Sequence, residues 1–538
     1  MSTRSLKGGW LQLDAQQAYE RRWWTLGVLC LSLTVISIDN TVLNVALPSI
    51  VKSLGARGSQ LQLLIDGYTI VFACLLLTAG SLGDKLGRKG ILTIGLAFFG
   101  ACSALAAFAP SAGTLILARA LMGIGGACIY PSTLSILTNT FADTRERARA
   151  IGIWAGVSGL GVAVGPLAGG ILLEHFWWGS VFLVNVPICA IAVTLGWFFV
   201  PTTERDQDSK LDPLGAVLSI IGLLGVLYAI IEIPDRGLSN TQVIVGLIAG
   251  VAFLALFGLW EKHYEHPMLD VRFFRNPRFT AASGTITLTF FALYGSTFLL
   301  TQYFQFVLGY SPLKAGMLAS PVAVGIMVTA PQAPKLVDRI GTKLVVVLGL
   351  SIVTTGLLLY SSNALMSSLV GGSVVRLLFG VGMGFTVAPA TESIMGSLPK
   401  AKAGVGSAVN DTTRQAGGAL GVAVIGSIFA LRYHSVVRVP PGLPPGAHPL
   451  IHDSIGRALD AITQFKLAPA TAHLVHLAAD RAYLSGMRLS VRIGACIVFC
   501  AALVALKFLP AHARPVDEDF DVETPPREVG HVERELLV

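Results

Sequence analysis

Long apolar stretches recur along the whole chain, from Trp23 to Pro510, and only short polar segments separate most of them. A helix needs about 20 consecutive apolar residues to cross the hydrocarbon core of a bilayer. Charged residues make up 13% of the 538 positions, well below the share in an ordinary soluble domain. The stretches are rich in Leu, Ile, Gly and Ala and too long for lipid-facing strands, so a transmembrane barrel is excluded. The sequence predicts an all-α polytopic membrane protein.

Fourteen transmembrane helices are expected. If the chain begins in the cytoplasm, most of its 39 Lys and Arg residues fall in the termini and cytoplasmic loops, and the short outer loops hold few. The positive-inside rule predicts this asymmetry, so we expect a multi-pass cell-membrane protein with both termini cytoplasmic. The expected spans are 23–47, 61–82, 90–109, 114–137, 149–173, 180–200, 213–232, 241–260, 279–304, 314–334, 343–361, 368–397, 404–431 and 486–509.

The two halves of the chain resemble each other. Asp84 aligns with Asp338 and Arg119 with Arg376, and the sequence Leu-Gly-Val-Ala-Val occurs at both 160–164 and 420–424. The three shifts are 254, 257 and 260 residues, so they drift smoothly. Repeats related by an axis along the membrane normal are typical of transporters. The two helices within 213–260 have no counterpart and are therefore interpreted as an insertion.

These observations divide the chain into five parts. They are a cytoplasmic N-terminal segment (1–22), an N-terminal six-helix bundle (23–200), two inserted helices with cytoplasmic linkers (201–278), a C-terminal six-helix bundle (279–509) and a cytoplasmic tail (510–538).

Residues 432–485 form a long extracytoplasmic loop within the C-terminal bundle. The loop has two proline-rich turns followed by apolar positions such as Ile455, Leu459 and Ile462. This pattern fits either an amphipathic hairpin on the outer surface or a loosely ordered loop. The acidic, proline-containing tail from Val516 is expected to be disordered.

The segment between the second and third expected helices reads Gly83-Asp84-Lys-Leu-Gly87-Arg88-Lys. It resembles the cytoplasmic signature of the major facilitator superfamily, which implies two six-helix bundles, here with two inserted helices. The glycines permit a tight turn. Asp84 is expected to pair with a neighbouring base or a helix N-terminus and so to hold one conformational state. Arg88 has a simpler alternative role as a topology-determining charge.

The second half repeats part of this signature at Asp338 and Gly341, for which we expect the same gating role.

A glycine-rich run in the fifth expected helix contains Gly161, Gly165, Pro166 and Gly169. It is similar to the motif that marks antiporters within the superfamily, so the resemblance implies export. Small residues every few positions allow close helix contact, and the proline can bend the helix where the two halves rock against each other. The alternative is an ordinary glycine packing seam.

The first expected helix contains the sequence from Asp39 to Pro48, and the second contains Ile65-Asp66-Gly-Tyr68. Both are similar to signatures of the fourteen-helix drug:proton antiporters, a group that includes quaternary-ammonium and methyl-viologen efflux pumps. The resemblance implies proton-coupled antiport of hydrophobic, often cationic compounds out of the cell by alternating access, and hence antibiotic resistance.

Five ionisable residues fall inside the expected spans: Asp39, Asp66, Arg119, Glu392 and Asp411. An ionisable group in a membrane span is costly and is a functional candidate by default. Asp39 and Arg119 are expected at comparable depth, from about 1.5 Å of rise per residue. The resemblance associates the arginine with proton coupling and the first aspartate with protonation or cargo binding. Asp66 is a further candidate for both roles.

Glu392 and Asp411 form a second acidic layer nearer the cytoplasm, for which we expect cargo binding. Simpler roles remain open for both and for Asp66. Arg414 follows Asp411 by three positions, which also fits a local ion pair. Glu392 also fits an interfacial carboxylate, and Asp66 a helix cap.

The chain has no Gly-x-x-x-x-Gly-Lys-Ser/Thr phosphate loop, so an ion gradient is the expected energy source. We expect no cofactor, no metal and no nucleic-acid partner; the partners are protons, small cargo molecules and lipid, and the functional unit is a monomer. Export of an endogenous lipid or metabolite is the alternative function. A membrane-embedded acyltransferase is disfavoured, because no His/Asp or Cys/His constellation converges within the spans.

Overall fold

The computed structural model describes residues 6–7, 10–11, 15–54, 58–202, 212–237, 239–265, 267, 269, 271–362, 368–398 and 402–511. The tail that begins at Val516 lies outside these residues. Thirteen helices of the described chain are long and apolar enough to cross a membrane. A further long helix, α6, has 32 residues and packs along α2. The expected all-helical membrane fold is confirmed.

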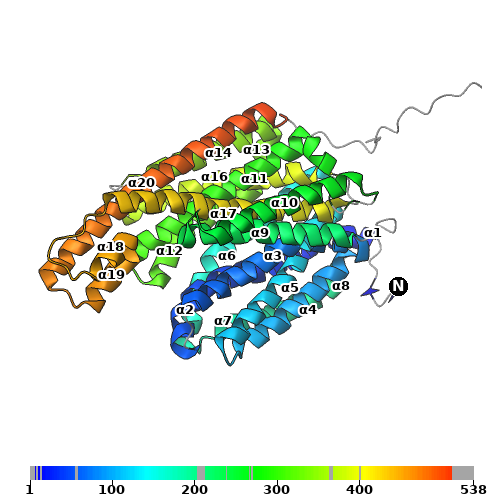
Figure 1. The fold of residues 1–538 in the computed structure, drawn as a ribbon. Coiled ribbons are helices and arrows are strands. Elements are labelled where there is room, and N and C mark those ends of the chain that lie inside the picture. Colours follow the sequence, from blue (N-terminus) through cyan, green and yellow to red (C-terminus); the bar gives the residue numbers. More distant parts are fainter. Residues whose placement is uncertain are drawn as a thin grey trace, which may run out of the picture.

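Helices α2 to α8 pack mainly on one another and are called the N half here (Figure 1). They follow two short paired strands, β1 (Leu6–Lys7) and β2 (Trp10–Leu11), and helix α1 (Ala15–Glu20). The helices are α2 (Arg22–Leu54), α3 (Gly58–Leu86), α4 (Arg88–Ala107), α5 (Ala112–Thr140), α6 (Thr144–His175), α7 (Ser180–Leu183) and α8 (Asn185–Phe199).

The elements from η1 to α20 form the C half. They are η1 (Val271–Arg275), α11 (Pro277–Gln302), η2 (Tyr303–Val307), α12 (Pro312–Thr329), η3 (Ala330–Gln332), α13 (Ala333–Ile340), α14 (Thr342–Tyr360), α16 (Leu369–Met395), α17 (Ala403–Val436), α18 (Ala447–Asp453), α19 (Ile455–Gln464) and α20 (Pro469–Phe508).

Short polar loops supply caps for the helix starts. The first backbone N–H groups of a helix have no partner within it, and a preceding Ser, Asp or Asn side chain can accept from them. Such caps precede α5, α6, α9, α11, α12 and α16, at Ser111, Asp143, Asp212, Asn276, Ser311 and Ser368. The turns into α4 and α14 instead pass through Gly87 and Gly341, whose φ angles of 99° and 83° favour glycine.

The sequence repeat appears as repeated helix packing. In the N half α6 lies along α2, and in the C half α17 lies along α11. Glycines make both contacts close: a Cβ at Gly161 or Gly165 would overlap α2, and a Cβ at Gly417 or Gly421 would overlap the α11 backbone. The two halves therefore use the same device at equivalent places.

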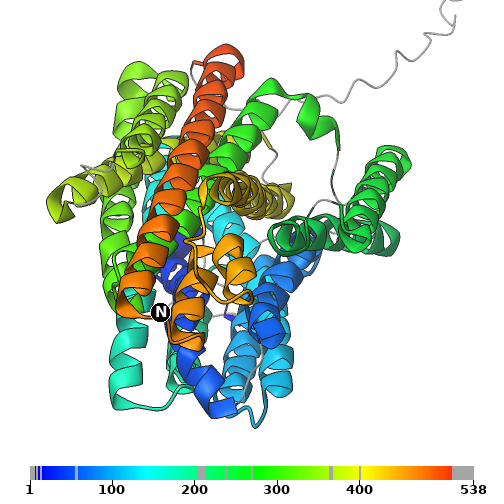
Figure 2. The same cartoon turned by 60° about the vertical axis from the view of Figure 1, so that its left-hand side comes forward.

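The inserted helices α9 (Pro213–Arg236) and α10 (Thr241–His263) lie to one side of both halves (Figure 2). They pack closely through glycines: a Cβ at Gly225 would lie 2.8 Å from the Gly246 carbonyl oxygen and the Gly250 Cα. Helix α9 also contacts α3 and α17, one from each half. The pair thus lies against the seam between the halves.

The end of the bundle where α18 and α19 lie is called the cap end, and the opposite end, where α2 begins, is called the amino end (Figure 1). Residues 447–464 form two short helices rather than an irregular loop. Ile451, Ile455 and Ala458 are buried, and the Tyr433 hydroxyl donates to the Ile451 carbonyl at 3.2 Å. The structure therefore matches the amphipathic alternative.

The expected start of the last helix at residue 486 is wrong. Helix α20 begins at Pro469 and has 40 residues. Its first turns bury Val475, Ala479 and Tyr483, and the Tyr483 hydroxyl donates to the Leu299 carbonyl at 2.6 Å. Only one stripe of this extension is apolar, so a search for continuous apolar runs does not find it.

Candidate functional site

Asp39 and Arg119 form an ion pair inside the N half. Asp39 lies in the middle of α2 and Arg119 in the second turn of α5. Their side chains are 0% and 2% exposed. Because burying two charges is costly unless they are paired and hydrogen-bonded, the pair requires further partners.

Asn185 holds the Asp39 carboxylate from the other side, and Ser103 lies behind Asn185. The Asn185 side-chain amide, at the start of α8, donates to Asp39 Oδ1 at 3.1 Å and contacts Ser103 Oγ at 3.0 Å. Ser103 donates in turn to the Phe182 carbonyl at 2.9 Å. Asn185 was not among the predicted site residues, since an amide at a helix start has no charge to distinguish it.

Helix α3 covers the arginine. Arg119 Nε donates to the Leu64 carbonyl at 3.4 Å, and its guanidinium carbon lies 4.3 Å from the centre of the Tyr68 ring. An arginine over an aromatic face is stabilised by a cation–π interaction. Any event that separates Asp39 from Arg119 therefore also affects α3, α4 and α8.

Asp66 lies two residues after Leu64 in α3, but its side chain is outside the described residues. Its predicted roles in proton coupling and cargo binding stay predictions.

The Asp84 carboxylate joins the two halves at the amino end. It accepts from Gly404 N at 3.1 Å and from Val405 N at 3.2 Å, both in the first turn of α17. It also pairs with Arg88 at 2.7 Å. Anions are stabilised at a helix N-terminus, where backbone N–H groups lack partners.

Gly80 makes the same contact close, because a Cβ there would lie 2.7 Å from the Ala408 Cβ. Arg88 and Lys89 are buried rather than exposed topological charges, and Lys89 donates to the Val200 carbonyl at 2.7 Å. Both therefore take part in packing as well as in charge placement.

The repeat partner Asp338 lies in a different environment. It is 54% exposed, and its nearest ion-pair atom is Arg145 Nε at 3.9 Å. Surface pairs of this kind contribute little. Although Gly341 reproduces the tight turn of Gly87, Asp338 has no pair of backbone N–H partners like that of Asp84 among the described residues.

Glu392 makes a second contact between the halves. Its Oε1 lies 3.1 Å from Arg147 Nη2 of α6, and both side chains are about seven-eighths buried. Glu392 and Asp338 line one cavity of about 200 Å³ between α6 and the C half. The docking of the halves thus buries Glu392 and gives it an arginine partner, while its role in cargo binding stays a prediction.

Asp411 and Arg414 are both buried in α17, but the described residues show no ion pair between them. Arg414 lies between two aromatic rings, 5.0 Å from the centre of Trp154 of the N half and 5.1 Å from Phe290 of the C half. One Asp411 oxygen accepts from the Asn410 amide at 3.1 Å, and the other has no partner in the described chain.

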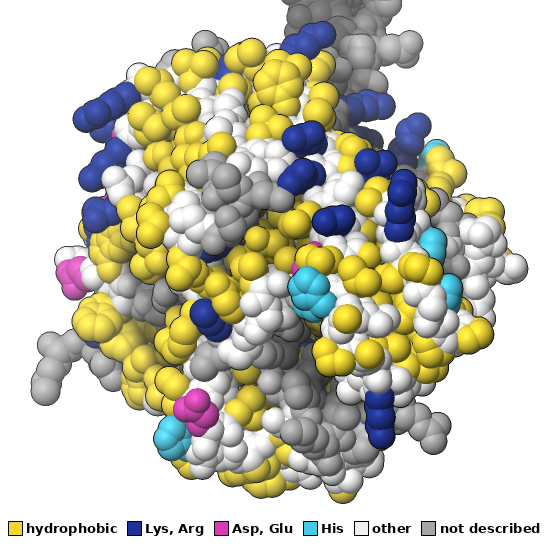
Figure 3. Space-filling view, turned by 90° about the vertical axis from the view of Figure 1, so that its left-hand side faces the viewer, with side chains coloured by type: hydrophobic (Ala, Val, Ile, Leu, Met, Phe, Trp, Pro, Cys, Tyr) yellow, Lys and Arg dark blue, Asp and Glu magenta, His cyan; other side chains and the backbone are white. Residues whose placement is uncertain are grey.

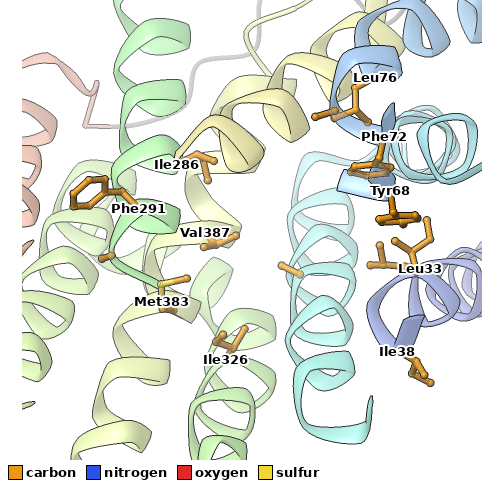
Figure 4. Close-up of a cluster of buried hydrophobic side chains, with 14 of the residues drawn as sticks. Leu33, Ile38, Tyr68, Phe72, Leu76, Ile286, Phe291, Ile326, Met383 and Val387 are labelled. Carbon is orange, nitrogen blue, oxygen red and sulfur yellow. The ribbon is translucent and has the colours of Figure 1, made fainter. Parts of the chain in front are cut away.

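Buried apolar side chains flank this region in both halves. Tyr68 and Phe72 of α3 lie on one side, and Ile286, Met383 and Val387 lie on the other (Figure 4). The Tyr68 and Phe72 rings stack at 5.8 Å, and Phe72 meets Tyr130 edge-on at the same distance. The region between the halves thus combines aromatic surface with a buried carboxylate.

The glycine motif of α6 serves two neighbours. Gly161, Gly165 and Gly169 face α2 within the N half, and Thr41 Oγ1 donates to the Gly161 carbonyl at 3.1 Å. Gly152, Gly156 and Gly159, earlier in α6, face the C half, where a Cβ at Gly159 would lie 3.0 Å from Ile326 Cγ2. The glycines of α6 thus contact the C half in the first part of the helix and α2 in the later part. The Pro166 side chain is outside the described residues.

Comparison with known proteins identifies this arrangement. Residues 29–422 match the Major Facilitator Superfamily. The chain belongs to this superfamily. A major facilitator chain is a multi-pass membrane transporter, and the fourteen long helices agree with that architecture.

Two superfamily relatives are similar over almost their whole length. The multidrug efflux pump LfrA of Mycolicibacterium smegmatis is 40% identical over 490 residues, which cover 90% of this chain and 95% of the relative. The methyl viologen resistance protein SmvA of Salmonella typhimurium is 33% identical over 464 residues, covering 86% and 93%. Among solved structures, the human organic anion transporter MFSD10 superposes with a TM-score of 0.59 at 14% identity, covering 90% of this chain and 99% of that one, and so shares the fold.

Proposed function

We propose that this transporter exports hydrophobic, often cationic compounds in exchange for protons. The observation that carries the proposal is the buried Asp39–Arg119 pair with its Asn185 and Tyr68 partners. A carboxylate inside a membrane span is a functional candidate by default, and proton relays use such groups. The names of the multidrug and methyl viologen relatives support the same cargo class.

In this proposal the protein spans the cell membrane, the amino end of the bundle is the cytoplasmic end, and both chain termini are cytoplasmic. The contacts of Asp84 with α17 and of Arg147 with Glu392 join the halves at this end. They support a state closed to the cytoplasm, with the cap end facing outward. The helices of each half move together, and α9 and α10 stay outside the moving core.

Protonation at Asp39 removes one of the two charges of the pair. Arg119 then loses its counter-ion, while Tyr68 and the Leu64 carbonyl still hold it. Leu64 and Tyr68 belong to α3, the helix whose last turn contains Asp84. A shift of α3 along its axis therefore links the proton site to the cytoplasmic closure. An inward proton releases about 2.3 kcal/mol per 100 mV of membrane potential.

Cargo binds between the halves, near the rings of Trp154 and Phe290. In the closed state the Arg414 guanidinium lies between these rings, at the position where a planar organic cation would stack. The free oxygen of Asp411 supplies the counter-charge. The monomer contains every residue that this scheme uses.

The test compares Asp39→Asn and Asp39→Glu with the wild type in proteoliposomes that contain matched amounts of protein. The amide keeps the shape but cannot exchange a proton, so proton-driven ethidium efflux should be lost in Asp39→Asn and partly kept in Asp39→Glu. Glu174→Gln removes an exposed carboxylate of α6 and should leave coupling unchanged. Wild-type coupling in Asp39→Asn would contradict the proposal.

A further inference from the structure

Arg376, the repeat partner of Arg119, is buried without an acidic partner in the described chain. It lies in the second turn of α16 and is 2% exposed. Its Nη2 donates to Ser373 Oγ at 3.2 Å, and its guanidinium carbon lies 5.0 Å from the centre of the Phe304 ring. Its Nε has no hydrogen-bond partner among the described residues. Because arginine stays charged in proteins, this environment leaves a buried positive charge unbalanced.

A small cavity lies against this guanidinium. Its volume is about 30 Å³, and Ser296, Phe304, Tyr360 and Arg376 are among the residues that line it. The Tyr360 hydroxyl is also buried without a partner in the described chain. A cavity of about 10–15 Å³ by this measure already holds one water molecule. The space therefore fits a small polar guest but not a drug-sized cargo.

The N half shows which group is missing. Arg119 and Arg376 are 257 residues apart, while the shift of 254 that relates Asp84 to Asp338 leads from Asp39 to Leu293. Ser296 lies in the cavity, and its hydroxyl donates to the Leu293 carbonyl at 3.1 Å. The C half thus keeps the arginine of the pair and has a neutral residue in place of the acid.

We propose that the Arg376 cavity binds a small monovalent anion, of the size of chloride or a single carboxylate group. The anion accepts from Arg376 Nε and from the Tyr360 hydroxyl and supplies the charge that Asp39 supplies in the N half. This inference is independent of the proposed cargo and of proton coupling.

The location of the cavity favours anion access. Tyr360 ends α14 and Arg376 lies near the start of α16, so the site is near the cap end. Exposed basic residues there include Arg432, Arg438 and Lys466. Figure 3, which views this end, shows Lys, Arg and His side chains spread over the face with few acidic ones. A surface of one sign raises the local concentration of the opposite ion.

The experiment measures the thermal unfolding midpoint of the purified full-length protein while chloride replaces gluconate at constant ionic strength. A ligand that binds only the folded state raises this midpoint in a saturable way. We expect a saturable rise for the wild type and none for Arg376→Gln or Ser296→Asp. Ser296→Asp supplies an internal counter-charge, so in gluconate it should melt no lower than the wild type.

Formate titrated in the same way distinguishes a carboxylate ligand from chloride, since a response to formate alone identifies a carboxylate as the ligand. Lys507→Gln, which removes an exposed lysine in the last turn of α20 at the opposite end of the bundle, should keep the wild-type response. The proposal is overturned if neither anion raises the midpoint of the wild type, or if Ser296→Asp responds as strongly as the wild type.

Discussion

Asp84 and Gly404 are hydrogen-bonded at 3.1 Å although they belong to different halves and are 320 positions apart in the chain. The carboxylate lies at the end of one long helix and the N–H at the start of another. Since the bond exists only while α3 and α17 meet at the amino end, it depends directly on the conformational state. In the part of the chain that the structure describes, Asp338 of the second half has no such backbone partner, so it is a natural comparison for Asp84.

Asp84→Asn should favour opening at the amino end. The substitution removes the charge that two backbone N–H groups and Arg88 share, and hydrogen bonds to charged groups contribute about 1.5–3 kcal/mol each. We expect the distance distribution between two spin labels, one near the end of α3 and one near the start of α17, to shift toward longer values. Asp338→Asn is the matched control, and its shift should be small because surface pairs contribute about 0–1 kcal/mol. Equal shifts in both variants would show that the contact of Asp84 with α17 does not hold the amino end closed.

Asn185→Ala should weaken proton coupling without unfolding the protein. It removes the hydrogen bond to the Asp39 carboxylate, worth about 1.5–3 kcal/mol for a charged acceptor, or roughly tenfold or more in a rate or equilibrium. The measurement is ethidium efflux as a function of pH in proteoliposomes, and both the maximal rate and the pH of half-maximal efflux should differ from those of the wild type. Asn139→Ala removes an amide that bonds only within α5, so its pH profile should be unchanged.

Gly165→Ala should destabilise the N half. A Cβ at Gly165 overlaps the Thr41 side chain of α2, and overpacking of this kind typically costs about 1–3 kcal/mol. Gly27→Ala adds the same methyl group to α2 where nothing lies within 4 Å, so it should be neutral or slightly stabilising. Thermal unfolding in detergent compares the two variants. Similar midpoints would show that α2 and α6 can separate at no cost.

Glu392→Gln and Asp411→Asn should have different effects on cargo. Glu392 pairs with Arg147 across the halves, so its loss should reduce efflux of singly and doubly charged compounds alike. Asp411 has a free oxygen near the aromatic region, so its loss should reduce efflux of doubly charged compounds more. Ethidium and methyl viologen efflux, measured with equal amounts of inserted protein, separates these outcomes. A parallel loss in Asp411→Asn would indicate a structural role.

The sequence carried enough information to predict the helices and the repeat, since apolar runs and shifted motifs are local patterns. The estimate of depth put Asp39 and Arg119 at a similar level, and the structure places them in contact. The Asp84 contact with a helix N-terminus also follows the expectation from its position in the signature.

Contacts that depend on how the halves dock were beyond the sequence. Arg147 and Glu392 belong to helices that are far apart in the chain, so nothing local relates them. The spacing of Asp411 and Arg414 favours an ion pair equally with other roles, and only the tertiary arrangement shows that Arg414 lies between Trp154 and Phe290. Asn185 likewise becomes visible only when α8 lies beside α2.

The position of α9 makes the transporter asymmetric toward the lipid. A two-fold repeat alone would give two equivalent flanks, one where α3 meets α17 and one where α6 meets α12. Since α9 packs on both α3 and α17, the first flank is shielded and the second is not. In the proposed scheme, a compound dissolved in the bilayer would therefore reach the central region past α6 and α12, on the flank that the inserted pair leaves uncovered.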